Sequence, residues 1–470
     1  MSGALDYLQD LDRSVFDGAN QQSYALKAQK GLSEALIRRI SSDKKEPEWM
    51  LAHRLKSLAA FLKMPLPKFG VDLSDIDFES LIYYAAPSEM GGYATKWEDV
   101  PDDIKKTFER LGIPEAERKV LAGTGAQYDS LNAYHKLKEE WEAKGVLFED
   151  MDIALQKYPD LVKKYFMKCV PLHDHKFAAL HGAVWSGGTF LYIPEGVKVT
   201  APLQAYFRMN AKSMGQFEHT LIVVESGGEA HYIEGCSAPK YGSTSLHAGC
   251  VEIFVKPSAK FRYSSVENWS QDTYNLNTKR AIVEENAIME WVGGNLGSGR
   301  TMLYPCSILK GRGARADHLG VAFANAGQIQ DTGAKVMHLA PDTSSTVLSK
   351  SISKNGGVNV YRGLLHVAKG ATGAKSQIRC DALILDALSK NDTFPTMRIQ
   401  EDDVSIGHEA SVGRISEEQL FYLQSRGISE EAALAMIVNG FIEPIVKALP
   451  LEYAVEMNRL IEMEMERAIA

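Results

Sequence analysis

The chain has 470 residues, 45% of them hydrophobic and 24% charged, and a formal net charge of −8 at pH 7. This length exceeds that of one ordinary compact core and the composition is typical of a soluble globular protein, so we expect two or three substructures. The acidic balance, without a stripe rich in lysine and arginine, argues against a nucleic-acid-binding surface, and no apolar run approaches the roughly 18 residues that span a membrane.

The N-terminal third, residues 1–155, is predicted to be mostly helical. Its first residues lack the basic start and the apolar stretch of a secretory signal, which predicts a cytoplasmic protein. Apolar residues at helical spacing, broken by prolines, indicate where the helices lie. Helices are expected over the following segments: 33–40, 50–56, 102–111, 115–121 and 131–144.

Residues 156–412 repeat a pattern of short runs rich in Val, Ile, Phe and Tyr, each followed by a turn. The turn signature returns every 27–33 residues. It occurs as Glu195-Gly196-Val197, Gly228-Glu229-Ala230, Pro257-Ser258-Ala259, Glu285-Asn286-Ala287, Arg312-Gly313-Ala314, Pro341-Asp342-Thr343, Lys369-Gly370-Ala371 and Asp402-Asp403-Val404. A repeat of this length predicts a mainly β solenoid, in which each coil buries its inner face by stacking on its neighbours. The alternative is a β-sandwich, whose turns would recur every 8–12 residues without a longer period.

Residues 413–470 are predicted to be helical again. Ser416 and Gln419 fit a capping box, Gly427 is expected to end that first helix, and Gly440 to end the next. An apolar stripe follows the second helix: Ala433, Met436, Ile437, Phe441 and Ile445. Packing against the solenoid and docking of a partner explain this stripe equally well.

The chain has five cysteines, an odd number, and they are widely spaced without any C-x-x-C pair. This pattern argues against a disulfide framework and against a closed structural zinc site. Cys169, Cys250 and Cys306 are expected to be small buried residues. Cys236 is predicted to sit at an accessible turn between Gly235 and Pro239. The alternative is a turn cysteine without a role.

Three basic residues near Cys236 in the sequence, His231, Lys240 and His247, could lower the pKa of its thiol and favour the thiolate. A thiolate at an accessible turn would be a reactive nucleophile. The sequence therefore predicts an activated thiol at this position.

Cys380 precedes the pair His408-Glu409 by 28 residues, close to one repeat length. A thiolate, an imidazole and a carboxylate on neighbouring coils would be a ligand set suited to iron or an iron–sulfur cluster. The local turn signatures are 33 residues apart rather than 28, so the register between these two coils stays open.

Two glycine-rich runs, 293–299 and 370–376, do not have the spacing of a phosphate-binding loop. We interpret both runs as turns or loops between coils. No ATP hydrolysis by this chain is expected.

Longer motifs are distinctive, and they are spread over residues 25–470. They include Tyr206-Phe207-Arg208-Met209-Asn210, Tyr232-Ile233-Glu234-Gly235-Cys236-Ser237-Ala238-Pro239, Asn268-Trp269, Thr278-Lys279-Arg280, His408-Glu409-Ala410 and Met436-Ile437-Val438-Asn439-Gly440-Phe441. These motifs resemble SufB, of the SufB/SufD family of SUF iron–sulfur cluster assembly proteins. The resemblance implies a right-handed parallel β-helix core with helical segments at both ends. It also implies a non-catalytic scaffold for de novo cluster assembly.

The resemblance assigns roles to individual residues. Sulfur would enter as a persulfide at Cys236 and pass through the β-helix to Cys380. Arg208, Asn210, Trp269 and Lys279 match residues of that internal sulfur route. Cys380 and Glu409, with His408 as a further candidate ligand, match the site of the nascent, transient cluster at a scaffold dimer interface.

The resemblance also implies partners. The C-terminal region would dock SufC, an ABC-type ATPase that drives assembly, and a separate system would donate sulfur. Reduced flavin (FAD) is an electron source for some members. The second scaffold subunit would be the SufD paralogue or a second copy of this chain.

Two departures from the family pattern bear on these expectations. Glu267 stands where the pattern has glutamine, and the segment 408–414 combines a SufB-like Glu409 with a SufD-like Val-Gly-Arg ending. From that combination we expect a homodimer. The alternative function, a secreted-type solenoid polysaccharide lyase, would call for clustered Asp, Lys and Arg on one sheet face and a secretion signal, and neither is found in the sequence.

Overall fold

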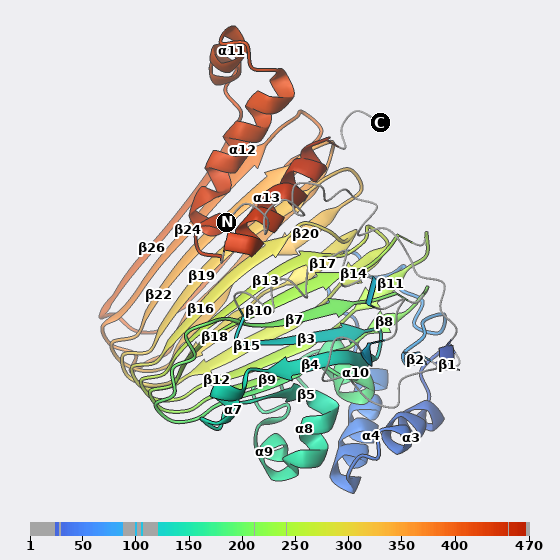
Figure 1. Ribbon diagram of the computed structural model, residues 1–470. Coiled ribbons are helices and arrows are strands. Elements are labelled where there is room, and N and C mark those ends of the chain that lie inside the picture. Colours follow the sequence, from blue (N-terminus) through green and yellow to red (C-terminus); the bar gives the residue numbers. More distant parts are fainter. Residues whose placement is uncertain are drawn as a thin grey trace.

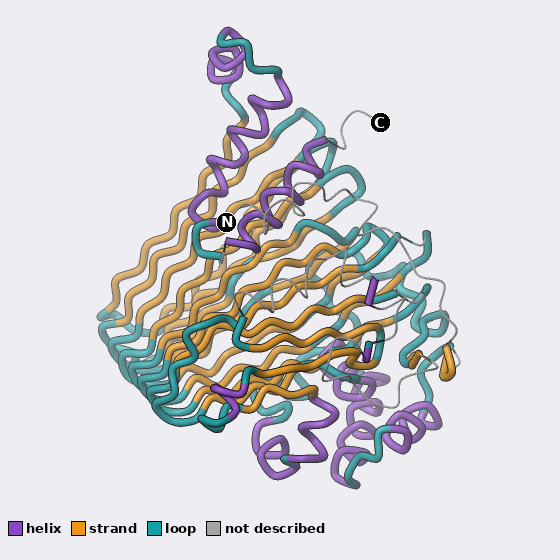
Figure 2. The backbone as a smooth tube through the Cα atoms, viewed as in Figure 1, coloured by secondary structure: helices purple, strands orange, loops and turns teal. Residues whose placement is uncertain are grey.

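The computed structural model is a parallel β-helix with helical layers beside it (Figure 1). The structure describes residues 24–27, 30–87, 99–100, 105–106, 121–210, 212–240, 242–449 and 451–466. The predicted mainly β solenoid with helices near both ends of the chain is confirmed; Figure 2 shows the strands stacked in rows. Within the described residues, no helix is both long enough and apolar enough to cross a membrane.

Two sheets build the solenoid. The ten-stranded sheet has the order β26 (Val404–Arg414), β24 (Ala374–Ile384), β22 (Ser344–Ser353), β19 (Arg315–Ala324), β16 (Ile288–Asn295), β13 (Lys260–Asn268), β10 (Glu229–Ser237), β7 (Leu203–Arg208), β3 (Gly123–Tyr128) and β4 (Leu131–Leu137). All neighbours in it are parallel except β3 and β4.

The fourteen-stranded sheet closes the other sides of each coil. One row contains β5 (Leu147–Asp150), β6 (Thr189–Ile193), β9 (His219–Val224), β12 (Cys250–Val255), β15 (Thr278–Val283), β18 (Cys306–Leu309) and β21 (Lys335–His338). The second row contains β8 (Gly215–Gln216), β11 (Ser245–His247), β14 (Thr273–Asn275), β17 (Arg300–Leu303) and β20 (Ile329–Thr332). The long strand β23 (Val358–Val367) joins the two rows and pairs with β25 (Lys390–Ile399). A short separate sheet pairs β1 (Tyr24–Lys27) with β2 (Ala85–Pro87).

The predicted turn recurs once in each coil, as expected. Seven of the eight turns have a residue with positive φ at the same stacked position: Gly196, Gly227, Ser258, Asn286, Gly313, Asp342 and Gly373. The backbone N–H of each donates to a carbonyl of the next coil, for example Ser258 to Glu285 at 2.8 Å and Asn286 to Arg312 at 2.9 Å. Stacked turns therefore satisfy one another's backbone groups, which explains why small or Asx residues recur at this position.

The interior of the solenoid is filled by alternate residues of its strands. In β23 every second residue is buried, as the two-residue period of a strand requires. The inward positions stack small and branched residues such as Ala281, Val283 and Val336. Each fully buried Val contributes about 1.5–3 kcal/mol, so the stacked coils stabilise one another.

The N-terminal helices cover the outer face of the fourteen-stranded sheet. The helices expected at 33–40 and 50–56 are confirmed as α3 (Glu34–Asp43) and α4 (Glu48–Lys63), and Ser33 caps α3 by accepting from the N–H of Leu36. The other helices of this layer are α8 (Met151–Lys157), α9 (Pro159–Tyr165) and α10 (Lys176–Val184). Their buried apolar residues form one cluster with outward residues of the sheet, including Leu221 and Val223.

The helix predicted over 131–144 is wrong. This segment contains β4, which pairs antiparallel with β3, and only the short helix α7 (Glu139–Glu142) follows. Asp129 has positive φ and turns the chain between the two strands, so tertiary pairing overrides local helix propensity. The helices expected at 102–111 and 115–121 lie outside the described residues, apart from 105–106 and 121.

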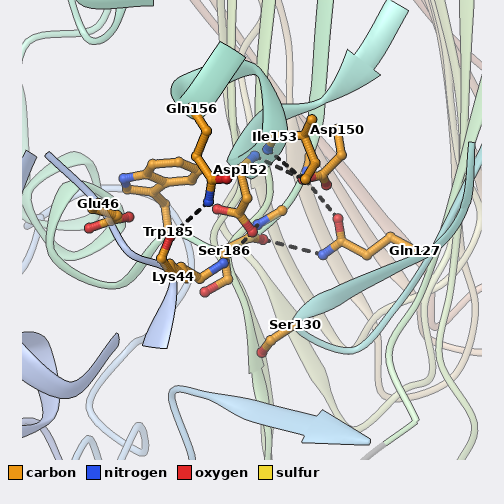
Figure 3. A network of polar contacts seen from close by, with 12 residues as sticks. Lys44, Glu46, Gln127, Ser130, Asp150, Asp152, Ile153, Gln156, Trp185 and Ser186 are labelled. Atoms are coloured by element: carbon orange, nitrogen blue, oxygen red, sulfur yellow. Dashed lines mark hydrogen bonds and ion pairs between the residues drawn. The ribbon is translucent and has the colours of Figure 1, made fainter. Parts of the chain in front are cut away.

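A polar network fixes the helical layer to the solenoid (Figure 3). Lys44, at the end of α3, forms a buried ion pair with Asp152 of α8. Gln156 donates to the Lys44 carbonyl at 3.0 Å, and Asp152 also accepts from the N–H of Gly187 at 3.1 Å. On the solenoid side, Gln127 of β3 accepts from Gly188 at 2.7 Å. These contacts fix the position of the layer because each joins buried polar groups of two different elements.

The C-terminal helices are α11 (Glu417–Ser425), α12 (Glu430–Val446) and α13 (Leu451–Glu466). The prediction that Gly427 ends the first helix is confirmed, but the second helix runs through Gly440. A glycine inside a helix costs about 1 kcal/mol, and buried residues on either side, Val438 and Ile442, hold this one in place. Helices α12 and α13 cover the outer face of the ten-stranded sheet, while α11 projects away from the body (Figure 1).

Candidate functional site

A line of small residues runs along the inner face of the ten-stranded sheet. The strand registers align the following residues, coil after coil: Glu234, Ser265, Gly293, Gly320, Ser349 and Cys380. Equivalent positions of paired parallel strands lie about 4.8 Å apart, so these residues form one line. Glycine and serine leave space that larger inward side chains would fill.

A cavity of about 60 Å³ lies against this line. It is lined by Tyr263, Ser265, Lys279, Trp291, Gly293, His318, Gly320, Ser349 and Tyr361, among others. One end reaches Lys279, near Cys236, and the other reaches Tyr361, near Cys380. With about 10–15 Å³ for each water-sized probe, the cavity has room for a small inorganic group.

Cys236 lies inside the solenoid at one end of the cavity. It is 1% exposed, and its sulfur is 4.0 Å from Oε1 of Glu234. Burial, with the carboxylates of Glu234 and Glu267, raises the pKa of its thiol well above the usual value, and Lys279 only partly opposes this. The prediction of an accessible turn is therefore wrong, because Cys236 is buried in strand β10. The direction of its pKa shift favours the thiol rather than the predicted thiolate.

The basic residues expected to activate Cys236 contact other groups. His231 alternates to the other face of β10 and contacts Ser264 at 2.8 Å, and Lys240 is exposed. His247 lies 2.5 Å from Oε1 of Glu218 and 2.8 Å from Oδ1 of Asn275. Proximity in the sequence did not indicate which side chains share the interior of the coil.

Lys279 is a buried cation of this interior that acts electrostatically on Cys236. Its ammonium is 2.6 Å from Glu267, 3.1 Å from Ser265 and 3.6 Å from Glu234. Burial alone would lower the pKa of Lys279, but Glu267 and Glu234 outweigh it and raise the pKa. Burial raises the pKa of Glu234 more than Lys279 lowers it. Glu267 therefore stabilises the charged form of Lys279.

The other residues of the predicted sulfur route surround the same coils. The Trp269 ring lies 4.3 Å from the His247 ring, inside the solenoid. Arg208 donates to Ser237 at 3.0 Å, and Ser237 alternates to the opposite face of β10 from Cys236. The backbone N–H of Asn210 donates to Asp129 at 2.6 Å. The structure thus brings Lys279 and Trp269 into the interior with Cys236. Arg208 lies on the opposite, outer face of the ten-stranded sheet.

Cys380 lies at the other end of the cavity and is 5% exposed. Its sulfur is 3.8 Å from Nε2 of His408. Burial raises the pKa of the Cys380 thiol to about 12, with the Tyr361 hydroxyl acting in the opposite direction and Asp381 adding to the rise. A metal ion would have to displace this proton to gain the thiolate.

The register explains which predicted ligands meet. Cys380 pairs with Ala410 rather than with His408, so His408 is two positions away and faces the same side of the sheet. Glu409 faces the opposite side, where its carboxylate is 3.4 Å from Nε2 of Gln377. The structure therefore brings Cys380 and His408 together, and Glu409 would have to reach around the edge strand to join them.

The solenoid ends in an uncovered coil beside Cys380. Strand β26 is the edge of the ten-stranded sheet, and β25 pairs with β23 alone. Large apolar side chains are exposed on this end, including Phe394, Met397 and Val412. A long exposed edge with apolar residues is a surface that favours pairing with another chain.

Several residues of this site were missed by sequence reasoning. The run 293–299, interpreted as a loop, begins inside strand β16, where Gly293 opens the cavity. Glu234 and Tyr361, which contact the two thiols, were not singled out. Glycine inside an apolar strand signals a close approach or an open space, and Gly293 and Gly320 carried that signal.

Comparisons with known proteins agree with this geometry. Residues 207–441 match the family model described as SUF system FeS cluster assembly, SufBD core domain, and residues 102–205 match the SufBD protein N-terminal region. A curated iron–sulfur cluster assembly SufBD family protein of Staphylococcus aureus is 56% identical over 443 residues, covering 94% of this chain and 95% of that protein. One of Staphylococcus saprophyticus is 55% identical over the same share of each chain.

Proposed function

Since the chain belongs to the SufBD family of iron–sulfur cluster assembly proteins, we propose that it is a scaffold that accepts sulfur at Cys236 and builds a transient cluster at Cys380. The observation that supports this most is the line of small residues and the cavity between the two thiols. Because the chain belongs to this family, we no longer consider the alternative function of a polysaccharide lyase. Reduced flavin stays a predicted electron source, and a separate system would supply the sulfur.

The contacts of Cys236 suggest how it accepts sulfur. The Cys236 sulfur bonds to the outer sulfur of a donor persulfide while the donor's sulfur–sulfur bond breaks, and the donor leaves as a thiolate. The proton of Cys236 passes to Glu234, its nearest carboxylate at 4.0 Å. Lys279 then stabilises negative charge on the buried persulfide. Cys380 lies five strand spacings, about 24 Å, from the strand of Cys236, so a small carrier must cross the cavity. Hydrosulfide would take the outer sulfur as hydrodisulfide and return Cys236 to its thiol, and the same exchange with Cys380 would form the second persulfide and release hydrosulfide again.

A sulfur chase tests this order. The protein is loaded anaerobically with glutathione persulfide, alkylated at successive times and mapped by peptide mass spectrometry. Sulfane sulfur is expected on Cys236 first and on Cys380 later, with little on the buried Cys250 and Cys306, because Cys236 and Cys380 are the two that lie beside Lys279 and Tyr361 of the cavity lining. Sulfur on Cys380 before Cys236, or undiminished on Cys380 in Cys236→Ala, would refute the proposed route.

The uncovered coil is proposed as the scaffold dimer interface. It combines unpaired strand edges with exposed apolar residues, and Cys380 and His408 would lie beside a partner that pairs there. The mixed SufB-like and SufD-like segment 408–414 favours a second copy of this chain as that partner. Glu409, which is exposed on the outer side of β26, stays a proposed ligand of the shared cluster.

The projecting helix α11 is proposed as the docking site of the ABC-type ATPase. Phe421 is 72% exposed, and Tyr422 and Met436 are exposed beside it. Tyr422, Leu423 and Ile437 line a shallow, mainly apolar hollow between α11 and α12. The stripe predicted on α12 thus has two roles: Ala433 and Ile445 pack inward, and Met436 remains for a partner.

Two charge substitutions should separate these surfaces. Met397→Glu places a carboxylate on the uncovered coil and is expected to convert a homodimer to a monomer while retaining the ATPase. Phe421→Glu is expected to weaken ATPase binding by at least about tenfold, the equivalent of about 1.4 kcal/mol, while leaving the dimer intact. Light scattering with and without the ATPase measures both. A monomeric wild-type chain that dimerises only with a SufD paralogue would contradict the homodimer.

A further inference from the structure

Two histidines and a cysteine meet between the helical layer and the fourteen-stranded sheet, outside the solenoid interior. His181 is on α10, His219 is on β9, and Cys250 is on β12 directly opposite His219 in the register. One ligand atom from each lies within 4.8 Å of the others, and all three side chains are buried. This cluster lies on the opposite face of its sheet from the Cys236 network, and nothing in the proposed assembly reaction uses it.

The outer nitrogens of both histidines already face acceptors. Nδ1 of His181 is 3.0 Å from the carbonyl oxygen of Ala248, and Nε2 of His219 is 3.2 Å from Oε2 of Glu252. Glu252 itself is held by the backbone N–H groups of Met167, Cys169 and Val170. In metal-binding histidines a carbonyl or carboxylate orients the ring from behind. The Ala248 carbonyl does so for His181, and the carboxylate of Glu252 is close enough to His219 to do so once that nitrogen is aligned with it.

The inner nitrogens, Nε2 of His181 and Nδ1 of His219, are 2.9 Å apart. A carbonyl oxygen can only accept, so Nδ1 of His181 carries the proton and Nε2 presents a lone pair. Nδ1 of His219 is within hydrogen-bond distance of this lone pair, and the buried Nε2 of His219 has no hydrogen-bond partner. A cation bound to Nε2 of His181, Nδ1 of His219 and the Cys250 sulfur would move the His219 proton to Nε2, where Oε2 of Glu252 at 3.2 Å can accept it.

We propose that His181, His219 and Cys250 form a buried site for a divalent transition metal, zinc by its ligand chemistry, that ties α10 to the sheet. Two imidazoles and one thiolate suit zinc, with bonds of about 2.0–2.1 Å to nitrogen and about 2.3 Å to sulfur. Tetrahedral bonds of these lengths require the sulfur to move inward and the two nitrogens to separate slightly. The ligands come from three distant segments, so no sequence spacing signals the site.

Cobalt substitution of the full chain tests this site, because Co²⁺ bound to a thiolate gives a near-ultraviolet charge-transfer band. Protein treated with a chelator is expected to bind one equivalent of Co²⁺ with this band, and Zn²⁺ should abolish the band by competition. Cys250→Ser should lose the band, whereas Cys380→Ala and Cys306→Ala should keep it. Glu252→Gln should keep the band but weaken zinc affinity about 10–100-fold, as loss of an orienting partner does.

Zinc K-edge X-ray absorption of the wild-type protein gives a second readout that needs no variant. Two nitrogen neighbours, one sulfur neighbour and one oxygen neighbour from a water as fourth ligand are expected, together with a higher Tm than that of the metal-free protein. The proposal is overturned if the wild-type chain binds no Co²⁺ or Zn²⁺ at one equivalent. It is also overturned if the thiolate band survives in Cys250→Ser and disappears in Cys380→Ala, which would place the metal at the assembly site.

Discussion

Replacing Cys380 with alanine is expected to abolish cluster formation while leaving the protein folded. The variant is incubated anaerobically with ferrous iron and sulfide, and cluster absorbance, iron and sulfide are measured. At least a tenfold loss is expected, because His408 alone offers no soft sulfur ligand at the uncovered coil. Removing one small buried group costs about 0.5–1.5 kcal/mol, so the fold should survive.

Cys306→Ala is the matched control, since Cys306 has the same 5% exposure as Cys380. It faces the opposite side of its strand from Ser307, which contacts Trp291 and His318 of the cavity lining. It should retain full cluster content. Glu409→Ala should lose less than Cys380→Ala, since sulfur is the softer donor and Glu409 faces the other side of β26. Retained cluster absorbance in Cys380→Ala, or an equal loss in the Cys306 control, would remove Cys380 from the proposed site.

Filling the cavity at Gly320 is expected to stop sulfur delivery without stopping cluster assembly itself. A Cβ built at Gly320 meets no heavy atom within 4 Å, so leucine there can extend into the open space. Cluster formation driven by a persulfide donor should fall at least tenfold, which needs a barrier only about 1.4 kcal/mol higher. Iron and inorganic sulfide, supplied directly at the uncovered coil, should still give a normal cluster.

The series Gly320→Ala, Val and Leu provides its own control, because only the size of the obstruction changes. Delivery should decline in that order, with alanine close to wild type. Overpacking costs about 1–3 kcal/mol, and Tm reports whether each variant remains folded. Full donor-driven activity in a folded Gly320→Leu protein would show that sulfur does not travel along this cavity.

The repeat and the turn chemistry made the solenoid predictable. Turn residues such as Ser258 and Asn286 recur at a fixed phase because each stacked turn needs positive φ at one position. Helix α3 was equally predictable from its cap at Ser33 and its apolar spacing. The segment 131–144 was not, because its strand exists only through pairing with β3.

The sequence predicted which kinds of residue form the candidate site, but it did not predict which of them contact one another. Cys380 and His408 were paired on the assumption of a 28-residue coil, whereas the register aligns Cys380 with Ala410. His408 still reaches Cys380, because it lies two residues before Ala410 and residues two apart face the same side of a strand. Glu409 lies one residue before Ala410 and therefore faces the other side. Cys236 was expected at an accessible turn, and burial among Glu234 and Glu267 reversed the expected direction of its pKa shift.

By itself, the sequence determined the period of the coil, the positions of its turns and the thiols available for sulfur chemistry, since these follow from local backbone and side-chain properties. Only the tertiary structure decided which side chains share an interior. The register between coils aligned Gly293 and Gly320 into a cavity, and the packing of α10 brought His181 to Cys250. Both depend on strand pairing and packing across long stretches of chain, where a shift of one residue would turn each side chain to the other face.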